Sequence, residues 1–222
     1  MQISVIGLGK VGVTLASCLV AAGHTVVGVD LDADIVASLN EGRFSTPEPG
    51  VMERLGRATP GQFRATTSTE EAVRDTAVTF VIVPTPSNAF GGFSVRFVLK
   101  ACERIGAAMK AKSSSHAVSV VSTMLPGSSD TLIIPCLEHA SGKKIGAGLQ
   151  YCYNPSFIAL GEVVKGMEQP DYLLIGEADT ASGDTILAVH KSMAASSPVA
   201  RMTPIEAEIT KIASNTHETM RV

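Results

Sequence analysis

The stretch QISVIGLGKVGVTLASCLVAAGHTVVGVD, residues 2–30, indicates the fold class of this chain. An apolar strand, ISVIG, runs directly into a glycine-rich turn, and an apolar helical pattern follows until Gly23 ends it. A second apolar strand, TVVGVD, comes next. Because two strands joined by a helix pair in parallel with a right-handed crossover, this order predicts the start of a parallel sheet.

Three glycines in GLGKVG have the spacing of a dinucleotide-binding fingerprint, after a strand and at the opening of a helix. Gly7 permits the tight turn, Gly9 lets the backbone approach a pyrophosphate at the positive helix end, and Gly12 allows close packing. Asp30 ends the second strand, where its carboxylate can accept hydrogen bonds from the adenosine ribose and would repel a 2′-phosphate. The sequence therefore predicts a site for NAD rather than NADP, and Val11 of the same turn is assigned to it.

Strands and helices alternate through most of the remaining sequence. Further strands are predicted over 63–68, 78–86, 116–123, 149–154, 172–176 and 198–202, and further helices over 33–42, 69–75, 95–110 and 127–138. The polar segments EADTASGD and KAKSSSH are interpreted as loops. We expect an α/β fold with a Rossmann-like, doubly wound, mostly parallel sheet over residues 1–202, with every carboxyl strand end at one edge.

Polar residues follow three of the later strands, at the edge where ligands bind such sheets. Thr85 and Pro86 follow one strand, Ser122 and Thr123 the next, and Asn154 a third. A hydroxyl at a strand end is commonly a helix cap, so a structural role and a functional role are equally open here. We assign Thr85, Pro86 and Thr123 to the cofactor site.

The last segment, TPIEAEITKIASNTHETMRV (203–222), is predicted to be the start of a long linking helix. Thr203 suits the N-cap, Pro204 the first helical position, and Glu206 completes a capping box. Lys211 and Asn215 are four residues apart and so project from one face, and we expect Lys211 to share a cleft with Thr123. The helix also carries an apolar stripe, which we expect to pack on a second copy of the chain unless the end frays: Ile205, Ile209, Ile212 and Ala213.

Composition and charge narrow the possible functions. With 45% hydrophobic residues among 222 the chain can bury a core, and a formal net charge of −3 offers nucleic acid no basic surface. We expect no signal peptide, and no apolar run reaches the roughly 20 residues that a membrane span needs. The four cysteines lie far apart in apolar stretches, which predicts reduced core thiols in a cytoplasmic protein, without a metal site: Cys18, Cys102, Cys136 and Cys152.

The segments GLGKVG, VDLD, TPEPG, VPTPS, STMLPGSSD, YNPSFIALGEVV and EAEITKIASNT occur in an order that resembles the nucleotide-sugar dehydrogenases, the UDP-glucose and UDP-N-acetylmannosamine 6-dehydrogenase family. The resemblance covers the whole chain. It implies oxidation of the C6 alcohol of a UDP-sugar to a carboxylate, with two hydride transfers to two NAD molecules and a thiohemiacetal on a cysteine in between. It also implies a role in polysaccharide biosynthesis and a homodimer formed through the 203–222 helix.

The same resemblance implies roles for individual residues. The catalytic candidates are Lys211 and Asn215, which would stabilise oxyanions or position a water, and Thr123, which would contact the cofactor and the reacting region. A primary ammonium beside a developing alkoxide provides electrostatic stabilisation, whereas a lysine on an isolated helix would simply be solvated. The candidates for substrate binding are Asn154, Phe157, Leu160 and Lys211.

Two features depart from the family pattern. Ser156 stands where the family usually has a glutamate after Asn-Pro, and Leu160 where many members have another acid, which would weaken water activation or general-base catalysis. No cysteine here has the glycine-rich context of the family nucleophile, which lies in the UDP-binding domain beyond the linking helix. We therefore expect the N-terminal half of an enzyme, able to bind NAD but unable to oxidise a UDP-sugar alone.

Two other interpretations stay open. The 3-hydroxyacid dehydrogenases of the 6-phosphogluconate type also pair a GxGxxG domain with a K-x-x-x-N helix, although their usual Ser-Gly-Gly turn is missing here. A non-catalytic dinucleotide-binding module would also fit the missing acids, since a fold does not guarantee activity.

Overall fold

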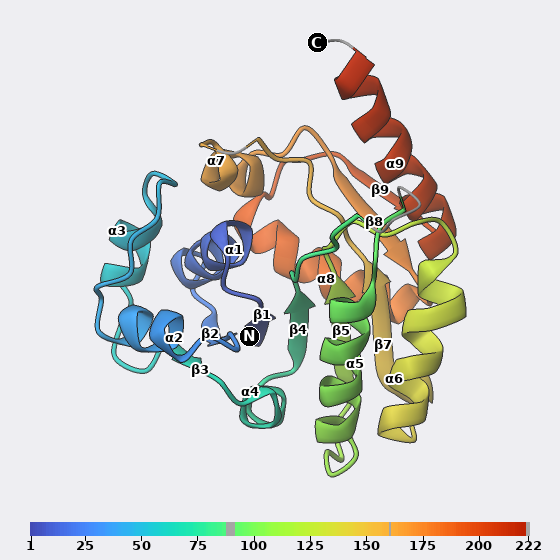
Figure 1. Cartoon of the computed structure of the whole chain (residues 1–222), viewed down its shortest axis with the longest axis horizontal. Helices are drawn as coiled ribbons and strands as arrows, with labels where there is room; N and C mark the ends of the chain where they lie inside the picture. Colours follow the sequence, from blue (N-terminus) through green and yellow to red (C-terminus); the bar gives the residue numbers. More distant parts are fainter. Residues whose placement is uncertain (88–91, 160, 221–222) are drawn as a thin grey trace.

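The computed structural model describes residues 1–87, 92–159 and 161–220, and in them a single sheet has helices on both faces (Figure 1). The strands run in the order β3-β2-β1-β4-β5-β7-β8-β9, and β6 pairs with β7. The doubly wound arrangement predicted from the alternation is confirmed. The strand bounds are β1 Gln2–Ile6, β2 Thr25–Val29, β3 Phe63–Thr66, β4 Val78–Val81, β5 His116–Val120, β6 Lys144–Ile145, β7 Gly148–Tyr153, β8 Leu173–Glu177 and β9 Val199–Met202.

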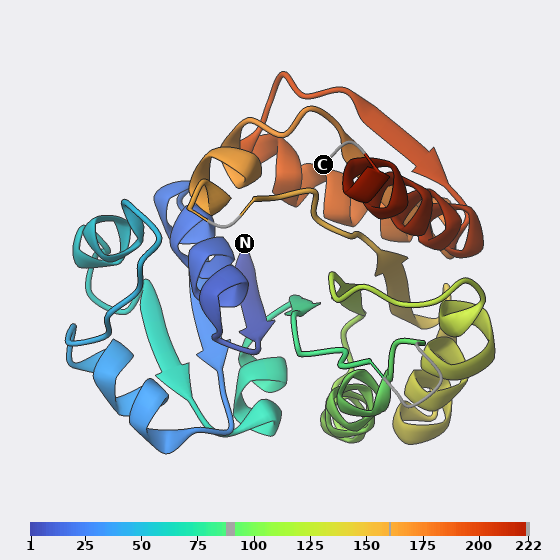
Figure 2. The ribbon, with the colours of Figure 1, turned by 45° about the horizontal axis from the view of Figure 1, so that its top comes forward.

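The helices divide between the two faces, and each group packs on its own cluster of buried side chains. The first group contains α1 Lys10–Ala21, α2 Ala33–Asn40, α3 Val51–Gly56, α7 Val163–Glu168 and α8 Thr180–Met193. The second contains α4 Thr69–Asp75, α5 Arg96–Met109, α6 Ile134–Ser141 and α9 Pro204–Met220. In Figure 2, α7 lies beside α1, while α5 and α6 lie side by side across the sheet.

The central strand β1 pairs in parallel with β2 on one side and β4 on the other. The strand order therefore reverses direction between β1 and β4, which makes this point the topological switch of the sheet. In open α/β sheets, ligands bind beyond the carboxyl ends of the strands at such a switch. The glycine turn after β1 lies there.

The expectation that every strand ends at one edge is wrong for β8 and β9. β8 runs antiparallel to β7, with Cys152 opposite Glu177 and Tyr153 opposite Gly176, and β9 runs parallel to β8. A parallel pair needs a crossover of the sheet, whereas the chain after β7, which contains the six-residue helix α7, re-enters the sheet from the carboxyl side.

Several predicted boundaries also differ. EADTASGD is only partly a loop, because Asp179 accepts a hydrogen bond from the Ser182 N–H and caps α8, which begins at Thr180. The helix predicted from 127 begins as a π-helical turn, Ser129–Ile133, before α6; Pro135 has no N–H to continue a regular ladder. The two-residue strand β6 was not predicted. The strands predicted over 63–68, 78–86 and 116–123 end earlier, at Thr66, Val81 and Val120, where hydrogen-bonded pairing with the neighbouring strands stops.

The last helix, α9, begins beside the carboxyl end of β7, because β8 and β9 deliver it there. Half of the predicted capping box is present: the Thr203 N–H donates to the Glu206 carboxylate over 2.8 Å, and the Thr203 hydroxyl donates to the same carboxylate over 2.7 Å. Ala207 packs against Gly176 of β8, and the helix then runs past the edge of the sheet as far as Met220 (Figure 1).

Candidate functional site

The glycine turn between β1 and α1 is shaped by close backbone contacts. Gly7 has φ +95°, and a Cβ at this position would lie 2.1 Å from the Ile82 carbonyl oxygen. A Cβ on Gly12 would lie 1.8 Å from the Gly7 carbonyl oxygen. Only glycine fits at these two positions, as predicted from the fingerprint.

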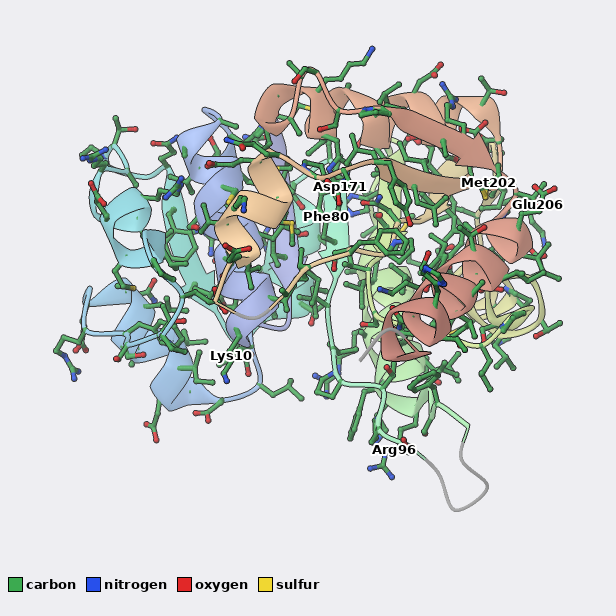
Figure 3. The ribbon with its side chains drawn as sticks, turned by 90° about the horizontal axis from the view of Figure 1, so that it is seen from above. Lys10, Phe80, Arg96, Asp171, Met202 and Glu206 are labelled. Atoms are coloured by element: carbon green, nitrogen blue, oxygen red, sulfur yellow. The ribbon has the colours of Figure 1, made fainter. Side chains whose placement is uncertain are left out.

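Gly9 differs, because a Cβ there would have no heavy atom within 4 Å. The fold therefore does not require glycine at this N-cap of α1. Any side chain there would, however, narrow the space through which a ligand approaches the Gly9 backbone. Lys10 marks the start of α1 when the edge is seen from above (Figure 3). A bare backbone at a helix N-terminus fits the pyrophosphate of NAD, which needs close approach to N–H groups.

Asp30 lies just beyond β2, and its carboxylate supports the turn. One oxygen accepts the Leu8 N–H over 2.8 Å and the other accepts the Asp32 N–H over 3.0 Å. Each carboxylate oxygen has a second lone pair, so Asp30 can also accept from a ribose hydroxyl. It lines a largely apolar cleft of about 270 Å³, whose other walls include Gly7, Val29, Val83, Phe97 and Ala101.

The structure brings the other cofactor candidates to the same edge. Val11, in the first turn of α1, and Thr85, in the segment after β4, are half-buried, and Pro86 is exposed. Ser122 has a structural role: its hydroxyl accepts from the Val83 N–H at 2.9 Å and donates to the Val83 carbonyl at 2.7 Å. Contacts between these residues and a cofactor stay predictions.

Lys211 is buried on α9, with 7% of its surface exposed. Its ammonium donates to the Ser156 carbonyl oxygen over 2.8 Å and lies 4.4 Å from the centre of the Phe157 ring. Burial lowers the pKa of Lys211 to about 8. The alternative of a solvated helix lysine is therefore wrong.

The remaining sequence candidates are placed as follows. Thr123 is half-buried just after β5, and Lys211 contacts the segment after the neighbouring strand β7. Both residues therefore lie at the carboxyl edge of the sheet. A cleft common to the two stays a prediction. Asn215 is exposed, one turn beyond Lys211. The Asn154 amide donates to the Leu174 carbonyl, and its amide oxygen bonds His190, so Asn154 supports the segment after β7 from the interior. Leu160 lies outside the described residues.

Two buried carboxylates were missed by sequence reasoning. Glu208 is fully buried on α9 and bonds the segment after β5, and Glu48 of the TPEPG loop is 3% exposed and bonds the segment before α7. Their partners lie 81 and 113 residues away, so no local pattern could have indicated them.

None of the four cysteines has the environment of a nucleophile. Burial raises the pKa of Cys18 to about 11 and raises the pKa of Cys102, Cys136 and Cys152 as well. Because the thiolate is the reactive form, these raised pKa values disfavour the reactive form of all four thiols. Within the described ranges there is no cluster of three His, Cys, Asp or Glu side chains for a metal, and no helix has both the length and the apolar character of a bilayer span.

Comparisons with known proteins place this site in a family. The profile described as "UDP-glucose/GDP-mannose dehydrogenase family, NAD binding domain" matches residues 1–194. The chain belongs to this family. The predicted resemblance and the NAD cofactor are thereby confirmed, and the 3-hydroxyacid dehydrogenase alternative is set aside.

The relatives include enzymes named for two nucleotide sugars. The chain is 37% identical over 224 residues to GDP-mannose 6-dehydrogenase of Pseudomonas syringae pv. tomato and 37% over 218 residues to UDP-glucose 6-dehydrogenase AglM of Haloferax volcanii. These alignments cover 100% and 97% of this chain but 50% of each relative. The chain thus spans about half the length of the curated relatives it matches.

Solved structures agree. A ternary complex of GDP-mannose dehydrogenase from Pseudomonas aeruginosa superimposes with a TM-score of 0.95 at 35% identity, over 100% of this chain and 50% of that one. A UDP-glucose dehydrogenase from Pyrobaculum islandicum gives 0.89 at 37% identity, over 96% and 48%.

Replacing Lys211 with methionine is expected to raise the free energy of unfolding by about 1–2 kcal/mol at pH 7, because it removes a desolvated charge. The pKa of the amine is about 8 in the fold against an ordinary 10.5, so the unfolded chain binds more protons between these values. Wild-type stability therefore rises with pH in this window, and the advantage of the variant shrinks. Urea unfolding at pH 7 and pH 10 measures both effects; an advantage unchanged by pH contradicts this account.

Proposed function

We propose that this chain is the NAD-binding part of an enzyme that oxidises the C6 alcohol of a nucleotide sugar to a carboxylate. The observation that carries the proposal is a buried lysine, Lys211, at the sheet edge that holds the glycine turn. A cation held there without solvent can stabilise an alkoxide as charge develops on it. Two NAD molecules, bound in succession, would accept the two hydrides that this oxidation releases, and a water would supply the second carboxylate oxygen.

We propose the following roles for the chain's own residues. As an ammonium Lys211 stabilises the oxyanion, and because the pKa of its amine is about 8, its neutral form can take up the alcohol proton as the pH rises towards 8. Asn215, one turn later, holds a water or an oxygen, and Thr123 contacts the cofactor and the reacting carbon. Gly9 and Asp30 bind the pyrophosphate and the ribose, with Val11, Thr85 and Pro86 beside them. We assign residues 1–202 to the NAD-binding domain and 203–222 to the linking helix.

The substrate we propose is a UDP-sugar, with Phe157, Asn154 and Leu160 on the segment that binds it. Relatives named for GDP-mannose and for UDP-glucose match at similar identity, so the supported class is a nucleotide sugar and the UDP nucleotide is the finer proposal. Ser156 and Leu160 replace family acids, which leaves Lys211 as the principal group for proton transfer.

We also propose a cytoplasmic homodimer that serves polysaccharide biosynthesis. Ile205 and Ile209 leave 40% and 52% of their surfaces exposed on α9. Exposed apolar surface on an element that projects past the sheet supports an interface between two copies of this helix.

A non-catalytic NAD-binding module remains the second candidate, favoured by the two missing acids. A chimera that joins residues 1–222 to the second half of a matched dehydrogenase distinguishes the two. Formation of NADH from UDP-glucose or GDP-mannose supports the enzyme, whereas NAD binding without NADH formation supports the module.

Replacing Asp30 with alanine is expected to weaken NAD binding about tenfold and to remove most of the preference for NAD over NADP. The carboxylate accepts from the ribose and repels a 2′-phosphate. Asp30→Asn is the matched variant, because it keeps an acceptor for the Leu8 N–H and removes only the charge. Calorimetry with both dinucleotides measures the effect, and tighter binding of NADP than NAD by the unmodified chain contradicts the assignment.

A further inference from the structure

The TPEPG loop, residues 46–50, contains a buried acid with long-range partners. Glu48 is 3% exposed. Its carboxylate accepts the Gly161 N–H over 2.7 Å and the Val163 N–H over 3.3 Å. The loop that leads into α3 therefore holds the start of α7, although the two are 113 residues apart in sequence.

A second contact joins the same two elements. Arg54 of α3 donates to both oxygens of Glu168 of α7, at 2.9 and 3.0 Å. Gly50, with φ +79°, turns the chain so that its carbonyl accepts from the same guanidinium over 3.2 Å. α7 is thus fixed at its start by Glu48 and at its end by Arg54.

The segment held by Glu48 leads directly to the partners of Lys211. Ser156, whose carbonyl accepts the Lys211 ammonium, and Phe157, whose ring lies under it, precede Gly161 in that segment. Phe157 also packs on Tyr172, with 4.7 Å between ring centres. The carbonyl and the ring can keep the lysine out of water only while the segment stays in place.

We propose that Glu48 is a positioning residue: it holds the segment between β7 and α7, described over residues 155–159 and 161–163, so that the Ser156 carbonyl and the Phe157 ring keep Lys211 desolvated. The inference rests on the proposed function, which gives Lys211 its role. Burying a carboxylate is costly unless hydrogen bonds compensate, and within the described residues the Glu48 carboxylate accepts from Gly161 and Val163 of the segment that it holds. The hydrogen bonds from Gly161 and Val163 offset that cost, so burial of Glu48 and the position of the segment depend on each other.

The test measures the amine pKa of Lys211 in the 222-residue chain, from the pH dependence of its acylation followed by mass spectrometry. Glu48→Ala is expected to raise the midpoint from about 8 by one unit or more towards 10.5, because the lysine becomes solvated. Glu48→Gln, whose amide can accept only one of the two N–H groups well, is expected to shift it less. The affinity for NAD is expected to stay within about twofold, since Glu48 does not line the dinucleotide cleft.

Glu53→Ala is the matched control, because Glu53 lies on α3 and pairs with Arg57 in solvent. It should leave both the midpoint and the NAD affinity unchanged. If Glu48→Ala does not fold, as judged by loss of NAD binding, the smaller shift in Glu48→Gln carries the test.

Amide hydrogen exchange at Gly161 and Val163 separates the possible failures. Faster exchange in Glu48→Ala with an unchanged Lys211 midpoint overturns the positioning role. A wild-type midpoint near 10.5 overturns the proposed role of Lys211. In that case exchange at the two amides still decides whether Glu48 holds the segment, and unchanged exchange in Glu48→Ala overturns the positioning role of Glu48.

Discussion

Replacing Gly12 with alanine is expected to lower the free energy of unfolding by about 3 kcal/mol or more and to abolish measurable NAD binding. The added Cβ would lie 1.8 Å from the carbonyl oxygen of Gly7 and 2.9 Å from its carbonyl carbon. Both atoms are backbone, and they belong to the turn that binds the cofactor. The clash can be relieved only by moving α1 away from β1, and α1 buries nine consecutive residues, Gly12–Val20, against the core.

Gly9→Ala is the matched control for this prediction. Its Cβ meets nothing within 4 Å, and Gly9 has φ −67°, which alanine adopts without strain. Its free energy of unfolding should stay within about 1 kcal/mol of wild type, while NAD binding weakens tenfold or more because the methyl group occupies the approach to the pyrophosphate. Urea unfolding and calorimetry on both variants test the pair; a Gly12→Ala chain of wild-type stability would show that the turn is not packed as described.

These two glycines also show why the first half of the fold was predictable. The fingerprint, the strand before it and Asp30 all lie within residues 3–30, so local spacing is enough to indicate the β1-α1-β2 unit. Residue types alone do not distinguish Gly7 and Gly12, which the fold requires, from Gly9, which it does not require. From the sequence, the three roles can be assigned only by analogy with the fingerprint. The structure separates them by what a Cβ would touch.

The far end of the sheet was less predictable, for a physical reason. An apolar run such as YLLIG indicates a strand but not its direction, because both orientations bury the same side chains. The direction of β8 depends on whether the chain crosses the sheet before it, and the short helix α7 gave no periodic signal of its own. The start of α8, predicted from the sequence to be a loop, did have a local signal. Asp179 lies three residues before Ser182, which is the usual spacing between an N-cap side chain and the N–H that it accepts.

The chemistry of the candidate site divides in the same way. Lysine and asparagine on one helix face could be predicted from their spacing, but burial of Lys211 comes from the segment after β7 folding over it. Glu48 and Glu208 are ordinary charged residues in sequence, and their burial depends on N–H groups far along the chain. Positions of this kind require the tertiary structure.

Replacing Glu208 with alanine is expected to lower the free energy of unfolding by about 3–5 kcal/mol, the largest loss we expect from any single carboxylate of this chain. Glu208 is fully buried on α9. One carboxylate oxygen accepts the Gly127 N–H over 2.6 Å, and the other accepts the Ser129 N–H at 2.8 Å and its hydroxyl at 2.7 Å. The Ser129 hydroxyl in turn bonds the Tyr151 hydroxyl over 2.7 Å, which extends the network into β7.

Alanine would leave these donors without acceptors and would open a cavity between α9 and the segment after β5, and each orphaned buried donor costs about 1–3 kcal/mol. Glu206→Ala is the matched control, because Glu206 lies on the same helix, is exposed and only completes the capping box, so its loss should cost about 0.5–1 kcal/mol. Urea unfolding of the two variants makes the comparison. Because Glu208 is one helical turn before Lys211 and holds the segment that follows Thr123, equal losses in the two variants would mean that α9 is not docked on that segment. In that case α9 would not hold Lys211 beside Thr123 at one site.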